Sequence, residues 1–171
     1  MKQKKALYAA LKDIMERLAC ILVTQPLHVV TVRAMASFVA QESDYSNILT
    51  GLASIYRENG ITGFWAGLVP RALGEALTIA LGAGLCHLMN MYVDKSMMPY
   101  TSHIGSYIAS SLCYPFTVVS HCSIVSRSGL AAGYPPHMPF YNSWVDTWRH
   151  LSRENQLKRG SSLLFRYLVD A

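Results

Sequence analysis

The chain has 171 residues, enough for one domain or for part of a larger protein. Hydrophobic residues make up 51% of it and charged residues 15%, below the roughly 25% of soluble domains, so the composition favours a membrane protein. The net charge is +5, but basic and aromatic residues are not interleaved and no C-x-x-C pair occurs, which argues against nucleic-acid, zinc and disulfide chemistry. We therefore expect no nucleic-acid partner, no metal and no other cofactor.

The first predicted element is a long helix over residues 6–40 that crosses the membrane and is kinked by Pro26. At about 100° per residue, its polar side chains share one face of the helix and form a polar stripe upstream of the kink. Asp13 and Arg17 are spaced so that they could also pair with each other. The residues of this stripe are Asp13, Arg17, Cys20, Thr24, His28 and Thr31.

Residues 47–58 have the pattern of a short amphipathic helix lying at the membrane interface. A folded corner follows, in which Gly60 and Gly67 permit unusual backbone conformations and Pro70 opens the next helix. That helix, over residues 71–93, is long enough to cross a bilayer, which takes about 20 residues. Its polar candidates are Arg71 at the start, then Glu75, His87 and Asn90.

The third predicted span covers residues 103–127 and is kinked by Pro115. No Lys, Arg, Asp or Glu occurs in it before its last residue. A Gly- and Pro-rich loop leads to a second interfacial helix over residues 140–153, which carries aromatic anchors. The last apolar stretch, residues 161–169, is too short to span a membrane.

The order of elements repeats along the chain, as kinked span, polar turn, interfacial helix and corner. Pro26 and Pro115 occupy corresponding places, and Glu58-Asn59 at the end of the first interfacial helix corresponds to Glu154-Asn155 after the second. The sequence thus predicts an all-α membrane protein made of two repeats. Residues 1–97 form a repeat with two spans, and residues 98–171 form an incomplete repeat with one span and an interfacial helix.

This pattern resembles the mitochondrial carrier superfamily, whose repeat has Pro-x-acidic-x-x-basic at a helix kink, then an interfacial helix and a corner with Glu-Gly and aromatic-basic-Gly steps. The matching segments here are Pro26-Leu27-His28-Val29-Val30-Thr31, Pro115-Phe116-Thr117-Val118-Val119-Ser120 and Trp65-Ala66-Gly67. The resemblance covers nearly the whole chain, as the second and third of three repeats, and implies that the first repeat is absent. In that family, the charged residues of the kink motif form a ring of salt bridges that closes the pore. The motif positions hold His28, Thr31, Thr117 and Ser120 here, so this ring is absent.

The chain looks like a member of the mitochondrial carrier homolog group, through Pro-Leu-His-Val-Val-Thr-Val-Arg, Gly-Leu-Val-Pro-Arg-Ala-Leu-Gly and Arg-Gly-Ser-Ser-Leu-Leu-Phe-Arg. Its members are similar to carriers that have lost the last span, which leaves a polar cavity open to lipid. The resemblance implies a multi-pass protein of the mitochondrial outer membrane that inserts tail-anchored and other α-helical proteins into the lipid bilayer. The alternatives are a receptor or scaffold for an apoptotic BH3-type protein and a small-solute carrier.

The predicted site consists of polar side chains on the spans, because charged residues inside a membrane are costly and usually face a cavity or a partner. Glu75 and Asp13 are the first candidates, with Arg17 and Arg71 as their counter-charges. Each has a structural alternative, since the charged residues lie near helix ends and histidines can be packed, hydrogen-bonded side chains. No phosphate loop or nucleophile elbow occurs, so we do not expect an enzyme. The weaker candidates are His28, His87 and Asn90.

Overall fold

The computed structural model describes residues 2–42, 45, 47–92, 98–126 and 128–161. All regular structure in these residues is helical, in the order α1 (Lys2–Ala40), α2 (Ile48–Asn59), η1 (Ile61–Trp65), α3 (Leu68–Tyr92), α4 (Met98–Val125), η3 (Ala131–Gly133) and α5 (Trp144–Arg153). Three stretches are long and apolar enough to cross a membrane: Tyr8–Ala40, Ile61–Tyr92 and Tyr100–Val125. The predicted all-α membrane fold is confirmed. The prediction for residues 161–169 falls outside the described residues, apart from Ser161.

Two helices begin at positions that differ from the prediction. α4 already begins at Met98, with Pro99 in its first turn, where a proline removes no intrahelical hydrogen bond. α5 begins only at Trp144, because Ser143 has extended dihedral angles and its hydroxyl accepts a hydrogen bond from the amide of Val145, which caps the helix. The third span is therefore longer, and the second interfacial helix shorter, than the sequence predicted.

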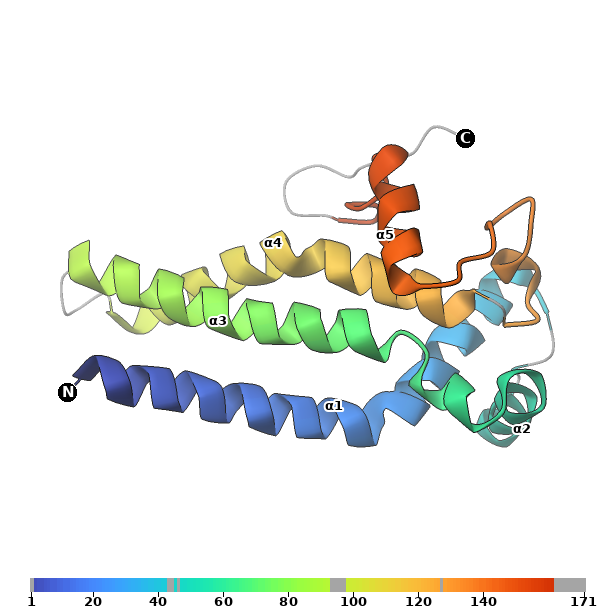
Figure 1. Ribbon diagram of the computed structural model, residues 1–171, viewed down its shortest axis with the longest axis horizontal. Coiled ribbons are helices and arrows are strands. Elements are labelled where there is room, and N and C mark those ends of the chain that lie inside the picture. The colour runs from blue at the N-terminus through green and yellow to red at the C-terminus, as the bar shows by residue number, and fades with distance from the viewer. Residues whose placement is uncertain (1, 43–44, 46, 93–97, 127, 162–171) are drawn as a thin grey trace.

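α3 packs against both of the other spanning helices, and lies along α4 for much of its length (Figure 1). Small residues allow this close approach: a Cβ added to Gly105 would lie 3.3 Å from the backbone nitrogen of Cys86. Helices in membranes commonly pack in this way, because small side chains let the backbones come together. α5 crosses α4 (Figure 1) and places Trp148 on Phe116, with ring centroids 4.7 Å apart.

Pro26 and Pro115 lie inside the continuous helices α1 and α4. A proline in a helix interior removes one backbone hydrogen bond and its ring presses on the preceding turn, so the helix bends there. Figure 1 shows the last part of α1 turning away from the first part. Beyond the two prolines, Val29 of α1 and Ile124 of α4 are fully buried in one apolar cluster with Ile55 of α2. The main core therefore lies at this end of the spanning helices.

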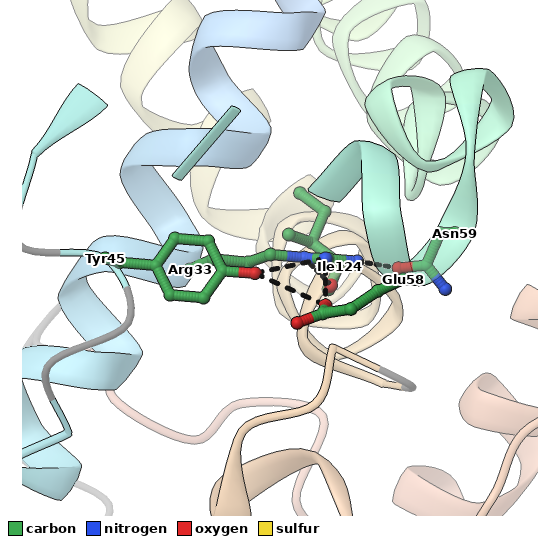
Figure 2. Close-up of polar contacts among 5 residues, drawn as sticks. All are labelled: Arg33, Tyr45, Glu58, Asn59 and Ile124. Atoms are coloured by element: carbon green, nitrogen blue, oxygen red, sulfur yellow. Dashed lines mark hydrogen bonds and ion pairs between the residues drawn. The ribbon is translucent and has the colours of Figure 1, made fainter. Parts of the chain in front are cut away.

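Arg33 ties three helices together beside this core (Figure 2). Its side chain is 1% exposed, and it donates to the backbone oxygen of Ile124 at 3.1 Å and to the side-chain oxygen of Asn59 at 2.8 Å. It also pairs with the Glu58 carboxylate at 3.3 Å and donates to the Tyr45 hydroxyl at 3.4 Å. Burial raises the pKa of Tyr45, so its phenol stays protonated and donates to Glu58. A charge can be buried this deeply because its hydrogen-bonding groups are satisfied.

Candidate functional site: a polar groove between the spanning helices

A cavity of about 560 Å³ lies between α1, α3 and α4, and we call it the polar groove. Its lining is rich in hydroxyl and charged groups, although each of the three helices contains a candidate membrane span. The groove is therefore a polar space within an otherwise apolar part of the molecule. Its lining residues are Arg17, His28, Arg71, Gly74, Glu75, Thr78, Ser106, Tyr107, Ser110, Cys113, Thr117, Ser120 and His121.

One ion pair crosses the groove from α1 to α3. The Nε atom of Arg17 lies 3.2 Å from the Oε2 atom of Glu75. The two side chains are 55% and 33% exposed, so the pair remains accessible from the cavity. Arg17 follows Asp13 by four residues on α1, so the sequence allowed these two side chains to pair. In the structure, Arg17 pairs with Glu75 of α3. The observed ion pair therefore joins two helices instead of bracing one.

A second arginine, Arg71 in the first turn of α3, also lines the groove. We call the part of the lining around Arg71 the floor of the groove. The Nη1 atom of Arg71 donates to the amide oxygen of Gln25 at 2.8 Å. Gln25 is fully buried next to Pro26, and its amide nitrogen donates to the backbone oxygen of Ala66 at 2.9 Å. These two hydrogen bonds orient the Gln25 amide, so Arg71 is held in place by a neutral group.

Two histidines face each other beside this floor. The rings of His28 on α1 and His121 on α4 have centroids 5.5 Å apart. Nearby, the hydroxyl of Ser120 donates to the backbone oxygen of Gly67 at 2.9 Å. Gly67 has a φ of +68°, and an added Cβ would lie 2.6 Å from the backbone oxygen of Ser120. Only glycine fits both this backbone conformation and this close contact between the corner and α4.

Residues 8–96 match the family described as mitochondrial carrier protein. The chain belongs to the mitochondrial carrier family. It is 42% identical over 162 residues to mitochondrial carrier homolog 2 of Bos taurus and of Homo sapiens, which covers 91% of this chain and 54% of theirs. It is 34% identical to mitochondrial carrier homolog 1 of Mus musculus, over 95% of this chain and 48% of that protein. No solved structure matches significantly.

Within the carrier family, this chain is a member of the carrier homolog group, and it spans about half the length of the curated relatives it matches. The family and the three apolar helices identify it as a mitochondrial membrane protein with a carrier-like all-α fold. In this carrier homolog, His28 stands at the acidic position of the first kink motif, and His121 lies opposite it on α4.

The structure brings four of the seven predicted groove residues together: Arg17, His28, Arg71 and Glu75. The other three lie outside the lining of the groove. Asp13 and His87 are exposed, and Asn90 accepts a hydrogen bond from Thr101 at 2.6 Å in the contact between α3 and α4. A stripe on a helical wheel defines a face of the helix but not a depth along its axis. The sequence therefore predicted a polar face on each of α1 and α3 without showing how far along the helix the groove extends.

The α4 side of the groove was not predicted from the sequence. Its small polar residues recur at spacings of four, three, four and three residues, which places them on one face of a helix. This periodicity could have predicted the α4 side of the groove. It was missed because hydroxyl groups are common in membrane spans, whereas charged groups are rare there. Gln25 was also missed as the support of Arg71, because its importance depends on a residue of another helix. The α4 residues are Ser106, Ser110, Cys113, Thr117 and Ser120.

Proposed function

We propose that this carrier homolog is an insertase of the mitochondrial outer membrane for tail-anchored and other α-helical proteins. The observation that carries the proposal is the accessible ion pair of Arg17 and Glu75 inside a polar groove between apolar helices. Each unsatisfied polar group costs several kcal/mol in hydrocarbon, so the polar end of a client meets a high barrier. A polar groove lowers this barrier by offering replacement partners, and this requires no covalent chemistry.

The outer faces of the helices support a location within lipid. Large apolar side chains of α1 are exposed, including Tyr8 at 74% and Val23 at 79%. Exposed apolar surface on this scale is expected where lipid covers a helix. A client would therefore find hydrocarbon for its anchor beside the helices and polar partners for its end within the groove.

The test is insertion of a purified tail-anchored protein into liposomes that contain the chain, compared with empty liposomes. We expect the chain to stimulate insertion, and we expect Glu75→Leu to reduce this several-fold while the protein stays in the membrane. Glu16→Leu is the matched control, because Glu16 is a 65% exposed carboxylate on α1 that pairs with Lys12 outside the groove lining. Folded wild-type protein that gives no more insertion than empty liposomes would refute the proposal.

A second candidate function is that of a receptor or scaffold for a BH3-type apoptotic protein. A cavity of about 500 Å³ between the end of α1 and the start of α2 favours it, because apolar side chains such as Met35, Phe38 and Ile48 line this cavity. An amphipathic helix of a partner protein can place its apolar face in a groove of this kind. Binding that survives Glu75→Leu but is lost in Phe38→Ser, without stimulated insertion, would favour the scaffold over the insertase.

A further inference from the structure

We propose that the floor of the polar groove binds the terminal α-carboxylate of an inserting client, with Arg71 as its counter-charge. This inference rests on the proposed function and assigns a client group to one part of the groove. A tail-anchored protein has its membrane anchor at its C-terminal end, so its terminal carboxylate has to pass the bilayer. A lone carboxylate is among the most costly groups to bury in an apolar environment. A cation in the groove should therefore lower the free-energy barrier to insertion most strongly for this terminal carboxylate.

The charges that line the groove are unequal in number. The described lining contains two guanidinium groups and one carboxylate. Glu75 forms its 3.2 Å ion pair with Arg17 and also attracts Arg71, which lies one helical turn away. Two cations thus share one carboxylate, and a client carboxylate would balance the charge.

Arg71 is positioned to accept such a partner. Among the described residues, its hydrogen bond to Gln25 uses one of the five N–H donors of a guanidinium group. Gln25 is itself fixed by the backbone of Ala66, so Arg71 is oriented before any ligand arrives. A guanidinium group can bind a carboxylate through two parallel hydrogen bonds. The remaining donors of Arg71 therefore match a carboxylate in both charge and geometry.

The surroundings of Arg71 add hydrogen-bond donors. His28 and His121 line the same cavity, and Arg71 interacts electrostatically with both imidazoles. Thr117 contributes a hydroxyl group to the same lining. Imidazole N–H and hydroxyl groups donate to carboxylate oxygens, so the cavity that contains Arg71 offers further donors to the same ligand.

Binding of short fluorescent apolar peptides to the detergent-solubilised chain tests the inference directly. The peptides have the same sequence and end in a free carboxylate or in an amide. We expect the free carboxylate to bind about tenfold more tightly, as for one added charge-assisted hydrogen bond. Equal binding of the two peptides would overturn the assignment.

Variants locate the effect within the groove. Arg71→Gln should remove the preference for the free carboxylate, and Arg71→Lys should keep most of it because the charge remains. The Lys variant and a circular-dichroism spectrum separate loss of the site from loss of the fold. Arg149→Gln is the matched control, since Arg149 is 70% exposed on α5 and outside the groove lining. A preference that persists in Arg71→Gln would overturn the proposal.

Liposome insertion of a client with a free or an amidated C-terminus separates this inference from the proposed function. Stimulation of both clients to the same extent would support an insertase and overturn the role of Arg71. Stronger stimulation of the free-carboxylate client, lost in Arg71→Gln, would support both. If neither client is stimulated, the insertase proposal fails, and the peptide affinities alone decide whether Arg71 binds a carboxylate.

Discussion

Arginine has different roles at the two ends of the spanning helices. Arg33 is 1% exposed and is hydrogen-bonded to a backbone oxygen, an amide, a carboxylate and a phenol, so it links α1, α2 and α4 (Figure 2). Arg17 is 55% exposed and contacts one carboxylate across the polar groove. The buried guanidinium group makes four hydrogen bonds to described residues, whereas the accessible one makes one and retains donors for a further partner. Charge within the spans thus stabilises the fold at one end and shapes a cavity at the other.

Helix packing explains the difference between the two ends. Beyond Pro26 and Pro115, α1 and α4 meet around Val29 and Ile124 and enclose the apolar core. The same helices and α3 surround the polar groove, whose lining runs from His28 and His121, just beyond the prolines, to Arg17 on their other side. The closed core and the open groove therefore meet near the bends, and each of the following predictions tests the difference between them.

We expect the largest effect on stability from Arg33→Leu. The substitution removes the buried donor that serves both Glu58 and the backbone oxygen of Ile124, which should lower the free energy of unfolding by about 3–5 kcal/mol. Unfolding in detergent, followed by circular dichroism, measures this loss. Arg17→Leu is the matched control and should cost less than about 1 kcal/mol, because its pair is half exposed. Equal losses would contradict the comparison of the two ends.

Gly67→Ala should have the next largest effect. The left-handed backbone conformation and the 2.6 Å approach to Ser120 together predict a loss of about 2 kcal/mol. Gly84→Ala is the matched control: Gly84 lies inside α3 with no atom within 4 Å of an added Cβ, so alanine should be neutral or slightly stabilising there. The same unfolding measurement applies. If the free energy of unfolding of Gly67→Ala equals that of the wild type, the corner can move away from α4.

The ion pair in the groove should contribute little to stability. A double-mutant cycle with Arg17→Gln and Glu75→Gln should give a coupling energy below about 1 kcal/mol, which decreases as salt is added, because the pair is accessible to solvent. Unfolding at two salt concentrations measures it. A coupling energy as large as the loss expected for Arg33→Leu would mean that the Arg17–Glu75 pair is shielded from solvent, as Arg33 is.

The smallest effects are expected at the predicted residues that lie outside the groove. Asp13→Asn and His87→Gln alter exposed side chains and should change the free energy of unfolding by no more than about 0.5 kcal/mol. Both variants should also retain stimulated insertion in the liposome assay. A loss as large as that of Glu75→Leu would show that the functional surface extends along α1 or α3 beyond the groove.

Much of the fold could be predicted from local sequence features. The three apolar spans were predicted, and the described structure contains them, because length and hydropathy act within a single segment. Gly60 and Gly67 were placed in the corner, and both have positive φ angles. The starts of α4 and α5 were placed less accurately, because helix ends depend on capping by a few side chains. The division into two repeats stays a prediction.

The sequence by itself determined the three apolar spans found in the described residues, the bends at Pro26 and Pro115, and the polar stripes of α1 and α3. These features follow from residues close together in the chain, since a helix in lipid has to satisfy its backbone internally. Only the tertiary structure decided which polar groups meet. Arg17 and Glu75 are 58 positions apart, Arg71 and Gln25 are 46 apart, and Arg33 reaches a backbone oxygen 91 positions away. Such contacts depend on where the helices cross, and no local pattern records that position.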